Sequence, residues 1–239
     1  ELVDVLKQIA SRIPRPSAII VVSAHWEESR PGITSGPNPA LIYDYHGFPE
    51  AAYHIQYPAP GHPALADEVF RLLENENMNP RKDSRRGFDH GLFVPLKIMY
   101  PQADIPCIQL SLMHSMDARQ HIHIGRALSG LNPANVLVLG SGFSFHHLRY
   151  FFLPATADTQ NKNASFEDWL VETCTDKNIS EAERHDRLVN WEKAPAARFC
   201  HPREEHLLPL HVCYGMAARP AQTALRFEIM GKQSSAFIW

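Results

Sequence analysis

The chain has 239 residues, of which 44% are hydrophobic and 21% charged, and its formal net charge is −3. This composition is typical of a globular protein with a sizeable core, and it excludes the disordered and low-complexity classes. The near-neutral charge gives no reason to expect a nucleic-acid partner, and no apolar run of about 18 residues is present to span a membrane. No glycine-rich linker or charge run divides the sequence, so we expect a single domain over residues 1–239.

The predicted elements alternate between helices and strands. The first residues form an amphipathic helix with Leu2, Val5 and Leu6 on one face, and the apolar run 18–23 follows as a strand. Such a continuous apolar strand is typical of a parallel sheet covered on both faces. The later elements that we predict are helices at 63–77 and 92–99, a strand at 105–112, a helix at 118–131, a strand at 135–140, helical segments within 151–203, a helix at 204–217, and strands at 224–230 and 234–239. The alternation favours an α/β fold with a mostly parallel central sheet flanked by helices.

Histidines follow two of the predicted strands. The chain has 14 histidines, and imidazole is a common metal ligand and proton carrier. His25 comes directly after the first strand, and His146 and His147 lie just beyond the strand that begins at residue 135. Ligands in open α/β sheets bind beyond the carboxyl ends of the strands, so these positions are candidates for function. His90 lies in a turn before a predicted helix, where Asp89 would serve as the N-cap.

Other histidines and acids have a structural interpretation. His121 and His123 are two residues apart on a predicted helix and point in different directions, so we expect both at the surface. Glu204 and Glu205 lie near the start of a predicted helix, where carboxylates favour the helix dipole. The sequence leaves a structural and a functional role for these two acids equally open.

The cysteines and glycines exclude several other kinds of site. The four cysteines are far apart and form no CxxC pair, which argues against a thiolate zinc site and a disulfide framework. We therefore expect a reducing, cytoplasmic setting. The residues around Ser144 lack the second glycine of a nucleophile elbow, and neither a Walker lysine nor GxGxxG follows Gly140.

Many short motifs occur in a characteristic order along nearly the whole chain. They are Ser23-Ala24-His25-Trp26, Asp44-Tyr45-His46-Gly47-Phe48-Pro49, Tyr57-Pro58-Ala59-Pro60-Gly61, Gly87-Phe88-Asp89-His90-Gly91, Gly140-Ser141-Gly142 with His146, Trp191-Glu192-Lys193-Ala194-Pro195, and His201-Pro202 with Glu205-His206-Leu207-Leu208-Pro209-Leu210. Together they resemble the DOPA-type extradiol dioxygenases, within the class of protocatechuate-type ring-opening dioxygenases.

The resemblance implies a site and a reaction. It implies that His25 and His206 bind a metal, that His146 is the acid/base of catalysis, and that His90 lines the site. The family opens the ring of a catechol with O₂ at a histidine-ligated, non-haem Fe(II) ion and yields a muconic semialdehyde. Zn(II) suits the same imidazoles but supports no redox chemistry. Glu205 is either an alternative ligand or a carboxylate that supports the ligands.

The family carries a further metal ligand in an HGSP motif at the end of its first strand. This chain has no such motif and opens in the helix expected after that strand. We therefore expect the first strand and one ligand to be missing from it.

Two alternatives to a dioxygenase stay open at this stage. The first is a zinc-dependent hydrolase, in which the same histidines would hold a metal that activates water. The second is a non-catalytic, metal-binding relative, for which the missing ligand would be an argument.

Overall fold

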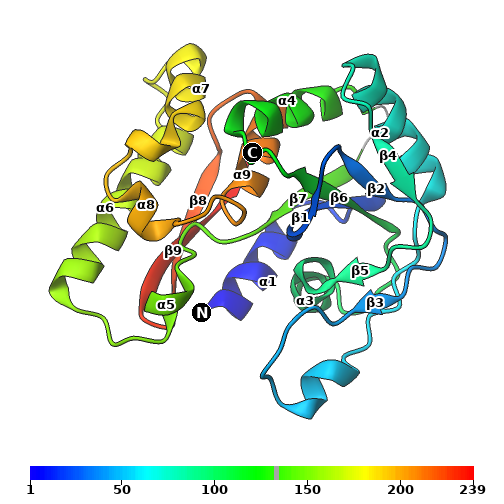
Figure 1. Ribbon diagram of the computed structural model, residues 1–239, viewed down its shortest axis with the longest axis horizontal. Coiled ribbons are helices and arrows are strands. Elements are labelled where there is room, and N and C mark those ends of the chain that lie inside the picture. The colour runs from blue at the N-terminus through cyan, green and yellow to red at the C-terminus, as the bar shows by residue number, and fades with distance from the viewer. Residues whose placement is uncertain (132–134) are drawn as a thin grey trace.

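The computed structural model describes residues 1–131 and 135–239, and its centre is a five-stranded sheet (Figure 1). In the order β4-β2-β6-β1-β7, the strands are β4 (Arg81–Asp83), β2 (Gly32–Thr34), β6 (Cys107–Met113), β1 (Ala18–Glu28) and β7 (Val136–Ser141). β1 is parallel to β6 and to β7, and β2 is parallel to β4, whereas β2 and β6 are antiparallel. The mostly parallel sheet is therefore confirmed, with one antiparallel ladder that the sequence pattern did not predict.

Helices flank this sheet, and most of them correspond to helices that the sequence predicts. They are α1 (Leu2–Arg12), α2 (Pro63–Asn75), α3 (His90–Met99), α4 (Ala118–Leu128) and α9 (Leu208–Ala217). Pro63 is the first residue of α2, where its missing N–H costs no hydrogen bond. The helix predicted at 204–217 begins only at Leu208, because the preceding residues form bends and turns.

The central strand β1 is buried on both faces. Ile20 and Val22 belong to an apolar cluster with residues of α2, α4 and α9, while Ile19 and Val21 belong to a second cluster with residues of α3. Successive side chains of a strand point to opposite faces, so a continuous apolar run satisfies both clusters at once. The sheet is thus the middle layer of an α/β domain.

The remaining elements lie on either side of this core. The strands predicted near the C-terminus form an antiparallel hairpin of β8 (Thr223–Ile229) and β9 (Lys232–Ile238), separate from the central sheet. A two-stranded parallel ladder joins β3 (Leu41–Ile42) to β5 (Phe88–Asp89). Figure 1 shows the hairpin beside α6 (Ala157–Thr175), and β3 and β5 beyond α3. The other helical elements are η1 (Glu50–His54), α5 (Leu148–Phe151), α7 (Glu181–Val189), η2 (Trp191–Lys193) and α8 (Ala197–Cys200).

The prediction of two surface histidines on α4 is wrong for one of them. His123 is exposed, as expected, and it pairs with Glu76. His121 is fully buried, where its Nδ1 donates to the carbonyl of Asp117 and its Nε2 accepts from the amide of Met113. Both ring nitrogens are satisfied by the backbone, which makes a buried neutral imidazole acceptable. Within the described ranges, no helix is both long and apolar enough to cross a membrane.

Candidate functional site

The four histidines that the sequence singles out lie together near the carboxyl ends of β1 and β7. The first strand is longer than the predicted run 18–23, so His25 lies within the carboxyl half of β1 rather than after it. The rings of the four histidines contact one another in the order His90, His25, His206, His146, which we call the histidine row. The ring centroids are 3.8 Å apart for His90 and His25, 4.9 Å for His25 and His206, and 3.4 Å for His206 and His146. These residues are up to 181 positions apart in the sequence, so only the fold brings them together.

His25 lies where the ladder between β1 and β6 is interrupted. The two strands pair up to Val22 and again from Glu27, with a shift of register between them. A bulge of this kind bends a strand and changes the direction of its side chains, and bulges are common beside active sites. The shift of register therefore helps to set the direction in which the His25 side chain points.

The first turn of α3 is held against β1 by a buried aspartate. The side chain of Asp89 caps α3 by accepting from the amide of Gly91 at 3.0 Å, as predicted, and it also accepts from the Ser23 hydroxyl at 2.8 Å. A Cβ on Gly91 would lie 2.4 Å from Ser23 Oγ and 3.1 Å from the His25 ring. Glycine at this position is what lets His90 approach His25.

The other end of the row depends on contact between two loops. The amide of Phe143 donates to the carbonyl of His206 at 3.1 Å, and the amide of His146 donates to the carbonyl of Cys200 at 3.0 Å. A Cβ on Gly142 would lie 2.2 Å from the same His206 carbonyl, so the close approach requires glycine. The segment after β7 is thereby fixed against the segment before α9, which stacks His146 on His206.

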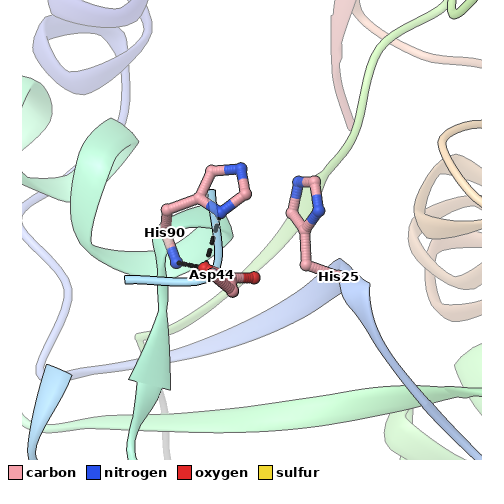
Figure 2. A group of neighbouring side chains, drawn as sticks. All are labelled: His25, Asp44 and His90. Atoms are coloured by element: carbon pink, nitrogen blue, oxygen red, sulfur yellow. Dashed lines mark hydrogen bonds and ion pairs between the residues drawn. The ribbon is translucent and has the colours of Figure 1, made fainter. Parts of the chain in front are cut away.

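A carboxylate stands at each end of the histidine row. Asp44 Oδ1 is 2.7 Å from His90 Nδ1, and Glu205 Oε1 is 3.1 Å from His146 Nδ1 (Figure 2 shows the first pair beside His25). Glu205 is thus part of the site. Glu204 instead pairs with Arg198 at 2.9 Å, outside the row.

Sequence reasoning gave Asp44 no role. Its only signal was a place in one of the family motifs, since the two-residue strand before it is too short to recognise from periodicity. His147, which the sequence placed beside His146, points elsewhere and contacts the carbonyl of Phe199 through Nδ1.

Burial makes the two central histidines neutral. It lowers the pKa of His206 well below the usual range, and the neighbouring His146 and His25 lower it further. It also lowers the pKa of His25, and the adjacent His90 acts in the same direction. Partial burial alone would raise the pKa of Glu205, but the hydrogen bond from His146 and the charge of Arg203 outweigh it and hold that pKa low. Neutral imidazole and ionised carboxylate are the forms that bind metal ions.

Two groups of donor atoms, one at each end of the row, could each hold a metal ion, and His25 and His206 belong to different groups. His25, Asp44 and His90 offer ligand atoms within 4.8 Å of one another, and so do His146, Glu205 and His206. His206 Nδ1 and Glu205 Oε2 are buried without a hydrogen-bond partner among the described residues. Buried polar atoms are nearly always satisfied, so the unpartnered His206 Nδ1 fits a site that accepts a ligand, whereas Glu205 Oε2 lies 3.7 Å from Arg203 Nη1 in an ion pair. Two imidazoles with a carboxylate are a set that non-haem iron and zinc both accept.

A cavity of about 650 Å³ reaches the row. His25, His90 and His206 line it, together with the segment 140–144 and apolar residues of α1, β7 and β9. A small molecule could therefore reach these three imidazoles, whereas His146, stacked on His206, does not line the cavity.

Comparisons with known proteins match this chain over most of its length to one family and its relatives. The family described as the catalytic LigB subunit of aromatic ring-opening dioxygenase matches residues 1–238. The 4,5-DOPA dioxygenase extradiol of Beta vulgaris is 37% identical over 212 residues, which are 88% of this chain and 77% of that protein. The protein of the same name from Escherichia coli (strain K12) is 35% identical over 225 residues, which are 94% and 81%. A crystal structure of the uncharacterized protein JW3007 from Escherichia coli K12 superimposes with a TM-score of 0.81 and 32% identity, covering 99% of this chain and 92% of that one.

Proposed function

This chain belongs to the family of the catalytic LigB subunit of aromatic ring-opening dioxygenases, and we propose that it opens the ring of a catechol with O₂ at a metal ion held by the histidine row. The reaction would cleave the ring next to the two hydroxyl groups and yield a muconic semialdehyde. The observation that carries the proposal is the row itself, with four imidazoles in ring contact between two carboxylates at the carboxyl edge of the sheet.

His25 and His206 are the ligands that we propose for the metal. They are the two central members of the row, and within the described residues no hydrogen bond reaches either ring, so a ring nitrogen of each is available. Fe(II) bound there would supply the redox-active centre at which a chelating catechol and O₂ are brought together. Among the four histidines, these two have no carboxylate of their own.

His146 is the acid/base that we propose for the proton transfers. Glu205 is ionised and offers only acceptors, so the hydrogen on their shared contact belongs to His146 Nδ1. The Nε2 atom then carries a lone pair that is able to take a proton from a catechol hydroxyl and return it to the leaving oxygen. Imidazole is suited to this task because its ordinary pKa lies near neutrality.

Oxygen consumption tests the proposal against its alternatives. The purified chain is loaded anaerobically with Fe(II), mixed with a series of catechols including DOPA, and exposed to ¹⁸O-labelled oxygen. We expect uptake of one O₂ per catechol and a product that contains both labelled atoms.

Three other outcomes would contradict the proposal. Turnover without O₂ by the zinc-loaded chain would indicate a hydrolase. Metal binding without turnover of any catechol would indicate a non-catalytic relative. Turnover that persists after treatment with a chelator would exclude a metal-dependent reaction.

A further inference from the structure

Asp44 reaches His90 because two short strands run in register. In the parallel ladder of β3 and β5, Ile42 is paired with Asp89. Asp44 comes two residues after Ile42, and His90 directly follows Asp89, so both emerge at the carboxyl end of the ladder. One carboxylate oxygen, Oδ1, accepts from the backbone amide of His90 at 3.1 Å and lies 2.7 Å from its Nδ1. The carboxylate therefore holds both the backbone and the ring of His90.

The contact determines which ring nitrogen of His90 carries the hydrogen. Partial burial alone would raise the pKa of Asp44, but its hydrogen bonds with His90 outweigh this and hold the pKa below the usual range. An ionised carboxylate only accepts, so Nδ1 is the donor and, in the neutral ring, Nε2 is the acceptor. Figure 2 shows the second nitrogen of His90 turned away from Asp44, on the side of the ring that faces His25.

This pair differs from the surface pairs of histidine and carboxylate in the same chain. His54 and Glu50 are 3.5 Å apart with side chains 72% and 91% exposed, and His123 and Glu76 are 46% and 49% exposed. The side chains of the Asp44 pair are only about one quarter exposed, and the His90 ring contacts the His25 ring at a tilt of 39°. Asp44 Oδ1 contacts both the amide and the ring of His90 at the edge of the site. This pair therefore orients the imidazole, unlike an exposed ion pair on the surface.

We propose that Asp44 is a positioning residue for the ring-opening reaction: it holds His90 with the hydrogen on Nδ1, so that Nε2 accepts a hydrogen bond from one hydroxyl of the bound catechol. The inference rests on the proposed function and adds a second carboxylate–imidazole pair to that of Glu205 and His146. A catechol has two adjacent hydroxyl groups, and the histidine row has one such pair at each end.

The first test reads the position of the hydrogen directly and needs no turnover. Long-range ¹H–¹⁵N NMR of the full chain, with Zn(II) in place of Fe(II) to avoid broadening, distinguishes the two neutral forms of each histidine ring. The signals of His90 are assigned by their loss in His90→Gln. We expect the Nδ1–H form in the wild type and the Nε2–H form in Asp44→Ala, because the orienting acceptor is gone. An Nε2–H form in the wild type, or no change in Asp44→Ala, would overturn the proposal.

The second test measures steady-state oxygen uptake in the Fe(II)-loaded variants. We expect Asp44→Ala to lower kcat by roughly 10- to 100-fold, the usual cost of removing a group that orients a site imidazole, with a smaller change in KM. Asp44→Asn keeps a carbonyl oxygen that can accept from Nδ1, so it should restore part of the loss. Asp104→Asn is the matched control, because that aspartate forms an exposed ion pair with Arg15.

The two tests separate this inference from the proposed function. If the wild type consumes no O₂ with any catechol, the proposed function fails, whatever the NMR shows. If the wild type is active and Asp44→Ala retains its kcat, the role of Asp44 is excluded while the function stands. A loss of kcat in Asp44→Ala that Asp44→Asn does not lessen would likewise contradict the orienting role.

Discussion

The four imidazoles of the histidine row differ in what holds them. His90 and His146 are each bonded through Nδ1 to a carboxylate, Asp44 and Glu205 respectively. His25 and His206 have no such partner within the described residues, and burial keeps them neutral. A carboxylate fixes which ring nitrogen carries the hydrogen both in a proton-transfer residue and in a metal ligand. The contacts by themselves therefore do not assign the two proposed roles, which substitutions have to separate.

Single substitutions should separate these roles. We predict that His206→Ala loses bound metal, measured by elemental analysis after loading with Fe(II) and desalting. His146→Ala should retain the metal but lose kcat by about 10²–10⁴-fold, the usual contribution of a general acid or base. The exposed His123→Ala is the control and should keep both properties. Unchanged metal content in His206→Ala would refute the ligand assignment, and unchanged turnover in His146→Ala would refute the acid/base role.

At the scale of elements, the site depends on where helices and loops meet the strands. The first turn of α3 lies against the end of β1, where Asp89 bonds to Ser23 and Gly91 leaves room for the His25 ring. The loop after β7 lies against the loop before α9 through the Phe143 amide and the His206 carbonyl. Each end of the row is thus placed by a close contact between two elements rather than by one element alone.

The junction of α3 and β1 is open to a direct test. We predict that Gly91→Ala destabilises the fold by about 1–3 kcal/mol, the usual cost of an inserted methyl group in a packed interior. It should also lower the rate of oxygen uptake, because α3 must move away from His25. Gly130→Ala is the comparison, since the only close approach of a Cβ there, at 2.9 Å, is to the end of the flexible Leu72 side chain, while the Ala127 carbonyl lies at an ordinary contact distance of 3.5 Å. Denaturant unfolding and oxygen uptake measure both effects, and a Gly91→Ala protein as stable and active as the wild type would disprove the role of this contact.

At the scale of the whole molecule, buried histidines couple folding to pH. Burial lowers the pKa of His121 to about 4 and that of His201 to about 3. In the unfolded chain both rings protonate near the ordinary pKa of about 6.5. Between about pH 6.5 and 4 the unfolded state binds more protons, so the free energy of unfolding falls as the solution is acidified. Buried neutral histidines therefore make the fold sensitive to acid.

One buried carboxyl opposes this trend. Burial raises the pKa of Glu167 to about 7, although hydrogen bonds from Ser144 and Ser235 act against the shift. In the unfolded chain this group titrates near its ordinary pKa of about 4.3. Between these values the folded state binds more protons, so the contribution of Glu167 to stability grows as the pH falls through this window. The net slope depends on both kinds of group.

Two variants should therefore change the pH dependence in opposite directions. We predict that His121→Gln makes the loss of stability between pH 6.5 and 4 shallower, by at most about 3 kcal/mol over the window. Glu167→Gln should make the loss steeper, because the opposing contribution is removed. Urea unfolding at a series of pH values measures the slopes, which are informative even if either variant is less stable overall. If the free energy of unfolding depends on pH in the same way in the wild type and in both variants, His121 and Glu167 do not determine the pH dependence.

Local sequence patterns were sufficient to predict the core helices and strands and to select the candidate histidines. The continuous run in β1 and the periodicity of α2 and α4 depend on neighbouring residues, and the motifs around His25, His90, His146 and His206 are also local. The short strands β2 to β5 were not predicted, because two or three residues carry no periodic signal. The burial of His121 was missed because its partners are backbone atoms, which no side-chain pattern reveals.

The amino-acid sequence by itself determined the fold class, the order of the main elements and the residue types able to hold a metal. Only the tertiary structure decided which of those residues meet, and which carboxylate orients which imidazole. Asp44 is the clearest case, since it is 46 residues from His90 and reaches it through a ladder of two-residue strands. The physical reason is range: helix and strand patterns arise from residues a few positions apart, whereas a site is made by contacts across the sheet that only the packed chain creates.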